Sequence, residues 1–238
     1  MKGYTSEMIR NVALLGHGGC GKTTFLEAAL LATGVISRLG KVEDGTTVSD
    51  YDKMEIEKGY SINTTLVPVE YNKVKINFVD TPGFFDFAGE VQGALRGVEA
   101  AAILVDAFSG IQVVTEKAWD ACKKLGSPKF FIINKIDKEN VDVDATIAQL
   151  QDKFGTSVVT LDDKDAMAEA IAEVDEELMD IYFNEGGFTD EQFSKGLTKG
   201  ILQGDIVPVF KCSSITGEGV KEVLQEIIDF VPNPTIEG

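Results

Sequence analysis

A glycine-rich segment at residues 16–23 constrains the fold of this chain more than any other feature, because it lies between an apolar run and a helical pattern. The preceding run, Ile9–Leu15, is typical of a strand, and residues 22–33 have the periodicity of a helix. Glycines let backbone N–H groups converge on phosphate oxygens, and the N-terminus of a helix adds a favourable dipole. The spacing Gly-x-x-x-x-Gly-Lys-Thr therefore predicts a phosphate-binding loop made of His17, Gly18, Gly19, Cys20, Gly21, Lys22, Thr23 and Thr24.

Two side chains of this loop have specific predicted roles. Lys22 can reach the β and γ phosphates of a nucleotide, and the hydroxyl of Thr23 can ligate Mg²⁺. The alternative is a glycine-rich turn from strand to helix that binds nothing.

Apolar, strand-like runs alternate with helical stretches along the chain. This alternation predicts an α/β fold, with a mostly parallel central sheet and helices on both faces. The runs 64–70 and 74–79 are separated by only three residues, so we expect one antiparallel edge strand. The other expected strands are 9–15, 101–106, 129–134 and 206–211, and the expected helices are 22–33, 89–99, 111–124, 141–153 and 219–230.

Residues 156–205 interrupt this alternation. They contain one long acidic helical run, Ala166–Phe183, and a second helix, Asp190–Leu202, whose cap is expected at Thr189. Because strand-like sequence resumes at Ile206, we predict an acidic helical insert at 156–205. The nucleotide-binding domain would then consist of residues 1–155 and 206–238.

Charge is distributed unevenly along the 238 residues, whose formal net charge is −17. Residues 139–238 hold 22 acidic and 6 basic side chains, whereas residues 1–138 are nearly balanced. An acidic surface argues against direct binding of nucleic acid by phosphate neutralisation. It serves either solubility or the docking of a basic partner.

Cysteine usage and hydropathy bear on location. Cys20, Cys122 and Cys212 are odd in number and share no metal-ligand spacing, so we expect free thiols in a reducing compartment, the cytoplasm. No apolar run reaches the roughly 18 residues of a membrane span, and no signal peptide precedes the first strand. We therefore expect no membrane association.

The segment Asn134-Lys135-Ile136-Asp137 follows a strand-like run and indicates which base the site takes. The carboxylate of Asp137 can accept hydrogen bonds from the N1–H and the 2-amino group of guanine, which adenine lacks. With adenine, the carboxylate would stay desolvated and unpaired, which is costly at a buried site. We therefore predict GTP and GDP as ligands, with Asn134, Lys135 and Asp137 selecting guanine. In the alternative, an ATPase, ATP would compete for the same site.

Two further segments complete the predicted site. Asp80 ends the strand-like run 74–79 and can hold Mg²⁺ through a bound water, while the N–H of Gly83 can meet the γ-phosphate. The guanine base is expected to be enclosed by backbone groups of the segment that follows the last strand, Ser213, Ser214 and Ile215.

Taken together, these motifs resemble the GTP-binding domain of translational GTPases, most closely that of elongation factor G and its paralogues. Residues 57–62, Glu-Lys-Gly-Tyr-Ser-Ile, are similar to the first switch of that family, and Asp80-Thr81-Pro82-Gly83-Phe84 to the second. The resemblance covers residues 8–155 and 206–238. It implies a P-loop GTPase fold, a switch driven by GTP hydrolysis in ribosomal translation, and a Ser61 hydroxyl that completes the Mg²⁺ shell.

The resemblance also implies partners. The ribosome would be the activator, and the acidic insert would face basic surfaces of the ribosomal stalk. Residues 156–205 match the inserted subdomain of the family only in part, and the insert is shorter than usual there. We expect the chain to be a monomer.

The second switch departs from the family pattern at one position. The family has a histidine that positions the attacking water, whereas this chain has Phe84, which can neither accept a proton nor orient water. Ser61 stands in place of a threonine and Gly19 in place of an aspartate. Phosphoryl transfer depends mainly on positioning and charge stabilisation, so Lys22 and Gly83 remain available as catalytic groups.

Two functions therefore stay open at this stage. If Phe84 packs within a competent switch and another group places the attacking water, the domain is a GTPase. Alternatively, the domain is a GTP-binding module with little or no hydrolysis that acts through its conformation.

Overall fold

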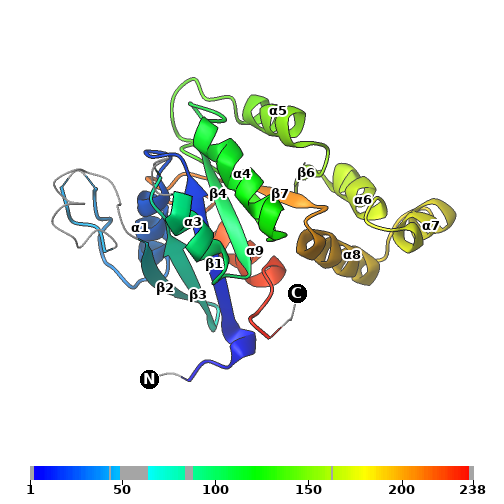
Figure 1. Cartoon of the computed structure of the whole chain (residues 1–238), viewed down its shortest axis with the longest axis horizontal. Coiled ribbons are helices and arrows are strands. Elements are labelled where there is room, and N and C mark those ends of the chain that lie inside the picture. Colours follow the sequence, from blue (N-terminus) through cyan, green and yellow to red (C-terminus); the bar gives the residue numbers. More distant parts are fainter. Residues whose placement is uncertain (1–2, 43, 49–63, 84–87, 162, 236–238) are drawn as a thin grey trace.

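The computed structural model describes residues 3–42, 44–48, 64–83, 88–161 and 163–235. Its strands are β1 (Ile9–Gly16), β2 (Thr65–Tyr71), β3 (Val74–Asp80), β4 (Ala100–Asp106), β5 (Lys129–Asn134), β6 (Val158–Thr160) and β7 (Val207–Cys212). These strands form a seven-stranded sheet in the order β2-β3-β1-β4-β5-β7-β6, which lies at the centre of the molecule (Figure 1).

One edge of the sheet is an antiparallel hairpin, as the sequence predicts. β2 and β3 pair in opposite directions, and the residues that join them, Asn72 and Lys73, have φ angles of 44° and 66°. Positive φ at both central residues is typical of tight hairpin turns whose twist matches that of the strands. The other neighbouring strands pair in parallel. The expected α/β architecture is confirmed.

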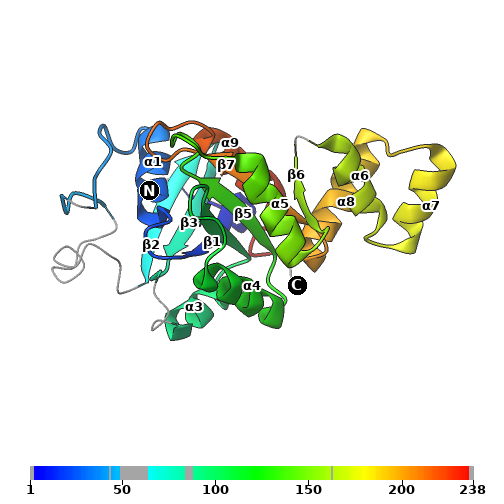
Figure 2. The same ribbon diagram turned by 90° about the horizontal axis from the view of Figure 1, so that it is seen from above.

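Helices cover both faces of the sheet (Figures 1 and 2). They are α1 (Lys22–Ala32), α3 (Ala88–Leu95), α4 (Val113–Leu125), α5 (Val143–Phe154), α6 (Lys164–Ala172), α7 (Glu176–Glu185), α8 (Asp190–Gln203) and α9 (Val220–Phe230). On one face, α1 and α9 bury side chains such as Phe25 and Leu224. On the other face, α3, α4 and α5 bury side chains such as Cys122 and Leu150. None of the described helices is both long enough and apolar enough to span a membrane.

The described part of residues 156–205 lies beside β7 and packs around an apolar cluster that also includes Ile206 and Phe230. The range is not wholly helical, because β6 pairs in parallel with β7 and extends the sheet. Met167 and Ile171 of α6 pack with Leu197 of α8 in that cluster, while α7 lies farthest from the sheet (Figure 2). The division of the chain into a domain and an insert stays a prediction.

The single helix expected over Ala166–Phe183 is wrong, since the structure has two helices, α6 and α7, in this region. Asp175 separates them: its backbone is extended, and its side chain accepts a hydrogen bond from the N–H of Leu178 at 2.8 Å. Such a cap begins a new helix even where hydrophobic periodicity continues across the break. The cap expected at Thr189 is present, with a reciprocal contact to Gln192.

Five parallel strands, β3, β1, β4, β5 and β7, end at the same edge of the sheet. Ligands of open α/β sheets bind outside this edge. Each segment of the predicted site that lies within the described residues follows the carboxyl end of one of these strands. The topology therefore collects segments that are far apart in the sequence.

Candidate nucleotide-binding site

The loop between β1 and α1 turns tightly because its glycines adopt backbone angles that other residues rarely take. The φ angle is 83° at Gly19 and 98° at Gly21. A Cβ atom on Gly21 would lie 2.4 Å from Nδ2 of Asn134. Gly21 therefore also permits the segment after β5 to approach the loop closely.

Lys22 lies inside the phosphate loop, with 7% of its surface exposed. Its Nζ donates hydrogen bonds to the carbonyl oxygens of Gly16 at 3.0 Å and His17 at 3.4 Å. A Cβ atom on Gly83 would lie 2.6 Å from Lys22 Nζ, and the N–H of Gly18 donates to the carbonyl of Gly83 at 2.8 Å. The structure thus brings together the two groups predicted to act on the γ-phosphate.

Thr23 and Asp80, two of the predicted metal ligands, also lie together. Thr23 Oγ1 donates to Oδ2 of Asp80 at 3.3 Å, and Asp80 is 1% exposed. A hydroxyl and a buried carboxylate are hard oxygen donors of the kind that Mg²⁺ takes along with phosphates and waters. The pair therefore fits the predicted ion. Within the described part of the chain, no three His, Cys, Asp or Glu residues are grouped to hold a metal by themselves.

The positions of two predicted site residues cannot be compared with the structure. Ser61, the expected third metal ligand, and Phe84, which stands at the position of the family histidine, lie outside the described residues. Their roles stay predictions.

Asn134 is fully buried and joins three segments of the site. Its Nδ2 donates to the carbonyl of Cys20 at 3.1 Å, which ties the end of β5 to the phosphate loop. Its Oδ1 accepts from the N–H of Ser214 at 3.0 Å and from the hydroxyl of Ser214 at 2.9 Å, which ties β5 to the segment after β7. The predicted contact of Asn134 with guanine is untested, and this cross-link is a role that sequence reasoning missed.

Lys135 extends back over the phosphate loop. Its Nζ donates to the carbonyl of Gly19 at 2.5 Å and to Oδ2 of Asp106 at 2.6 Å. Burial raises the pKa of Asp106, but the hydrogen bonds from Lys135 and from the N–H of Phe108, together with the charges of Lys135 and Lys138, outweigh burial and hold that pKa below its ordinary value. Sequence reasoning also missed Asp106. The available signal was a carboxylate at the carboxyl end of β4, a strand buried along its whole length.

Asp137 is exposed to solvent but held in orientation from the β7 side. Ser213 Oγ donates to Oδ1 of Asp137 at 2.5 Å and accepts from the N–H of Thr216 at 3.1 Å. Ser213 and Ser214 are buried, whereas the following Ile215 is 66% exposed. A carboxylate that is oriented and yet accessible is suited to recognising a base.

The remaining loop residues differ in their surroundings. His17 is exposed, with Nδ1 2.5 Å from the carbonyl oxygen of the next residue, and Thr24 is half-buried in the first turn of α1. Cys20 is buried, which raises the pKa of its thiol. All three cysteines are buried free thiols, and burial raises the pKa of Cys122 and Cys212 to about 12.

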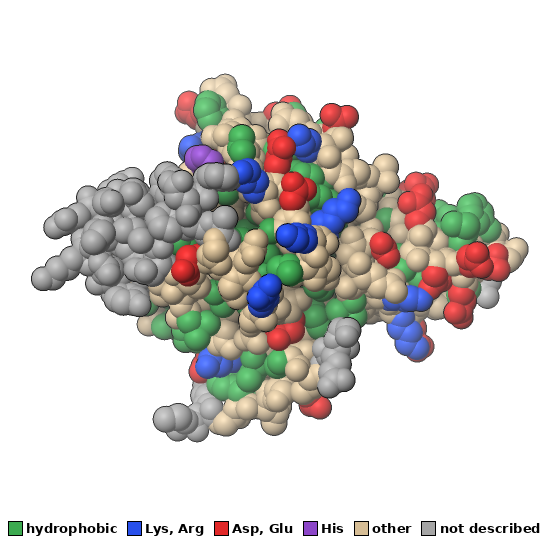
Figure 3. Space-filling model, in the orientation of Figure 1, with side chains coloured by type: hydrophobic (Ala, Val, Ile, Leu, Met, Phe, Trp, Pro, Cys, Tyr) green, Lys and Arg blue, Asp and Glu red, His purple; other side chains and the backbone are tan. Residues whose placement is uncertain are grey.

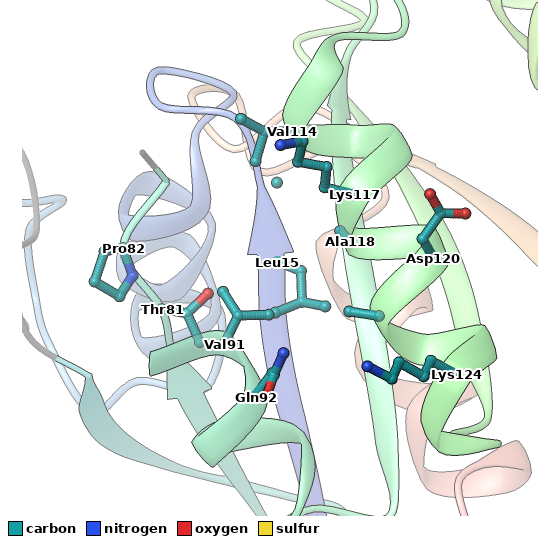
Figure 4. A pocket seen from close by; sticks show the side chains of 12 residues that line it. Leu15, Thr81, Pro82, Val91, Gln92, Val114, Lys117, Ala118, Asp120 and Lys124 are labelled. Atoms are coloured by element: carbon teal, nitrogen blue, oxygen red, sulfur yellow. The ribbon is translucent and has the colours of Figure 1, made fainter. Parts of the chain in front are cut away.

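A cavity of about 250 Å³ lies next to the phosphate loop, between α3 and α4 (Figure 4). Leu15, Val91 and Ala118 make much of its wall apolar, while Lys117 and Lys124 extend along it from α4. A nucleotide needs converging donors for its phosphates, so this cavity is not its site. The cavity nevertheless borders the predicted site, because Thr81 and Pro82, the two residues before Gly83, line it.

Comparisons with known proteins agree with this geometry. Residues 7–233 match the family described as "Elongation factor Tu GTP binding domain". The "Elongation factor G-like protein" of Mycobacterium tuberculosis, from strains CDC 1551 / Oshkosh and ATCC 25618 / H37Rv, is 30% identical over 266 aligned positions. A crystal structure of a Thermus thermophilus protein superposes with a TM-score of 0.89 and 30% identity, over 96% of this chain and 41% of that one. The match to the two curated relatives covers 95% of this chain but only 37% of their length.

Proposed function

Since the chain belongs to the elongation factor Tu GTP binding domain family and has a P-loop GTPase fold, we propose that it binds GTP and GDP with Mg²⁺ and hydrolyses GTP as a conformational switch in ribosomal translation. The observation that carries the proposal is the cross-link through Asn134. It holds the phosphate loop and the base-selecting segment in one arrangement. Neither segment alone would choose both a triphosphate and guanine.

Each part of the site has its own task in the proposed reaction. The backbone N–H groups of the loop and the ammonium of Lys22 hold the phosphates, and the N–H of Gly83 senses the γ-phosphate. Thr23 would ligate Mg²⁺ directly and Asp80 through a water, and the bound ion neutralises charge on the β and γ phosphates. Asp137, oriented by Ser213, accepts hydrogen bonds from guanine.

Base selection tests the binding part of the proposal. We expect isothermal titration calorimetry to give tight binding of GDP, and no competition from ATP. Asp137→Asn should shift the preference toward xanthine nucleotides, because the amide offers a donor to the 2-oxo group that replaces the 2-amino group of guanine. Asp152→Asn, which removes an exposed carboxylate from α5, is the matched control and should bind as the wild type does. Equal competition by ATP, with no change of preference in Asp137→Asn, would reject guanine recognition.

Hydrolysis needs a separate test, because Phe84 favours the second candidate, a binding module that hydrolyses little. Single-turnover cleavage of GTP should be measured with and without ribosomes. If the domain is a GTPase, ribosomes accelerate cleavage by the wild type well above the uncatalysed rate. If it is a binding module, cleavage stays at the uncatalysed rate in both conditions, and Phe84→His is the variant expected to introduce activity.

The acidic unit formed by α6, α7 and α8 is proposed as the surface that docks on basic parts of the ribosomal stalk. Acidic side chains gather over these helices, on the right of the molecule in Figure 3. On α7, Phe183 is 74% exposed and Met179 is 41% exposed, so an apolar anchor lies within the acidic surface. Aromatic anchors surrounded by charge are typical of protein interfaces.

Co-sedimentation with ribosomes at increasing salt tests this surface. We expect Phe183→Ser to weaken the association and leave the affinity for GDP unchanged. Leu66→Ser is the matched control, because Leu66 is 62% exposed on β2, away from the acidic unit. Equal effects of the two substitutions would contradict a docking role for α7.

A further inference from the structure

Two carbonyl groups of the phosphate loop are held from outside the loop. The carbonyl of Gly19 accepts from Nζ of Lys135 at 2.5 Å, and that of Cys20 accepts from Nδ2 of Asn134 at 3.1 Å. The N–H that follows the carbonyl of Gly19 is that of Cys20, and it donates to the carbonyl of His17 at 3.2 Å within the loop. Contacts from elsewhere in the fold therefore hold the backbone of the loop in its turn.

The contact with Gly19 depends on a third segment, because Asp106 at the end of β4 orients Lys135. Oδ2 of Asp106 accepts from Nζ of Lys135 at 2.6 Å. Oδ1 accepts from the N–H of Phe108 at 2.9 Å and, at 3.4 Å, from that of Ser109. Each oxygen of the carboxylate thus has a separate use. One fixes the carboxylate to its own turn, and the other holds the ammonium against the phosphate loop.

The ion pair is protected enough to hold this geometry. The side chains of Lys135 and Asp106 are 20% and 11% exposed, so solvent screens their interaction only in part. A second cation, Lys138, lies 3.9 Å from the same carboxylate oxygen, but it is 44% exposed. No contact of Lys138 with the phosphate loop is seen among the described residues, so Lys135 is the one that links Asp106 to Gly19.

We propose that Asp106 is a positioning residue for the phosphate loop, acting through the ammonium of Lys135 on the carbonyl of Gly19. The inference rests on the proposed function, because the phosphates of GTP and GDP are the anions that the loop would hold. It assigns Asp106 a task different from that of Asp137. Asp137 acts on the base, whereas Asp106 acts on the phosphate end and is indifferent to which base is bound.

Asp106→Asn tests this assignment with little structural change. The amide keeps an oxygen for the N–H of Phe108 but loses the charge that holds Lys135. Because a hydrogen bond between charged groups is lost, we expect the affinity for GDP to fall by roughly tenfold, with faster dissociation of GDP in stopped-flow measurements. In the Asp137→Asn background, the affinity for xanthosine diphosphate should fall by the same factor. Asp152→Asn, which removes an equal charge from α5, should change neither affinity.

A double-mutant cycle with Lys135→Met separates positioning from general loss of stability. If Asp106 acts through Lys135, adding Asp106→Asn to Lys135→Met causes little further loss of affinity. A melting temperature recorded for each variant shows whether the fold is kept. Should Asp106→Asn fail to fold, Asp106→Glu replaces it in the cycle, since it retains the charge at a shifted position.

The outcomes divide clearly. A wild type that binds no GDP would overturn the proposed function, and the inference with it. If the wild type binds GDP, the inference is overturned by any of three results: an affinity of Asp106→Asn within about twofold of the wild type, a full additional loss in the Lys135→Met background, or an altered preference between guanine and xanthine. A base-independent loss that disappears without Lys135 supports it.

Discussion

The candidate nucleotide-binding site at the carboxyl ends of the strands, called here the nucleotide end, and the unit at residues 156–205 differ in how far apart in the sequence their contacting residues lie. At the nucleotide end, the side-chain contact of Asn134 with Cys20 spans 114 residues of sequence, and that of Ser214 with Asn134 spans 80. In the other unit, the caps at Asp163, Asp175 and Thr189 each bind an N–H three residues further on. The first region therefore depends on the whole sheet being formed, whereas helix ends in the second are set locally.

This difference suggests where a small change matters. Long-range contacts of buried groups leave unpaired donors and acceptors when one partner is lost, and such groups are costly in a dry interior. Local caps at exposed helix ends contribute less to the free energy of unfolding, and the loss of one cap does not disturb the others. We therefore expect nucleotide binding to be sensitive to single atoms around the phosphate loop, and insensitive to the helix caps of residues 156–205.

Gly21→Ala should have the largest effect. The φ angle of 98° strains any other residue, and a Cβ atom would lie 2.4 Å from Nδ2 of Asn134. We expect the affinity for GDP to fall by about 100-fold, and the free energy of unfolding by about 2–4 kcal/mol. Gly126→Ala is the matched control, because Gly126 has a φ of 65° but no atom within 4 Å of its Cβ position. It should lose only about 1 kcal/mol and keep its affinity. Equal losses of affinity would contradict the role given to the Asn134 contact.

Glu27→Gln should have the next largest effect. Glu27 is 1% exposed on α1, and its carboxylate accepts from the N–H of Gly40 at 3.0 Å and from that of Val48 at 2.6 Å. The amide can accept at only one of these positions, so we expect a loss of about 1–3 kcal/mol in urea unfolding. Glu116→Gln, which breaks an exposed ion pair with Lys153, should lose less than about 1 kcal/mol. A similar small loss in both variants would show that the contacts of Glu27 with Gly40 and Val48 contribute little.

The pH dependence of stability sharpens the comparison further. Because the folded-state pKa of Asp106 is lowered, its contribution to stability is complete above the unfolded pKa of about 4 and is lost as the pH falls through the folded value. As the pH falls below about 4, melting temperatures of the wild type should therefore fall more steeply than those of Asp106→Asn. Parallel curves for the two proteins would contradict the ionised contact with Lys135.

Asp175→Ala should have the smallest effect and a local one. It removes the cap of α7 and an exposed contact with Lys199, so we expect a loss of about 1 kcal/mol in unfolding and no change in the affinity for GDP. Asp175→Asn keeps an acceptor for the N–H of Leu178 and should recover most of the loss. A lower affinity for GDP in Asp175→Ala would mean that this unit is coupled to the nucleotide end.

Sequence patterns predicted the long elements well, and the candidate site segments stay predictions. The apolar runs that became β1, β3, β4 and β5 are continuous, and the described site segments follow strand ends as expected. The patterns failed where a short or polar feature decided the structure. β6 has only three residues, too few for a period to be seen, and the cap at Asp175 divided a helical run whose apolar spacing continued unbroken.

Asp106 and Glu27 could not be predicted for a different reason. A carboxylate at a strand end or in a helix is usually solvated, and even the position of Asp106 at the end of a buried strand does not say which group it would contact. Lys135 reaches Asp106 because β4 and β5 are neighbours in the sheet. Glu27 receives two N–H groups because Gly40 and Val48 lie against α1.

The sequence by itself determined the α/β fold, the phosphate loop at residues 16–23, and the segment at 134–137 that indicates guanine. Each rests on local spacing, because glycines, apolar periods and strand ends act over a few residues. Only the tertiary structure decided which side chains hold that loop in place. Asn134 and Lys135 bind its carbonyl groups, and Asp106 sets Lys135, because parallel strands bring their carboxyl ends to one edge of the sheet. The sequence therefore predicts the groups that would contact a nucleotide, and the fold supplies the contacts that keep them in position.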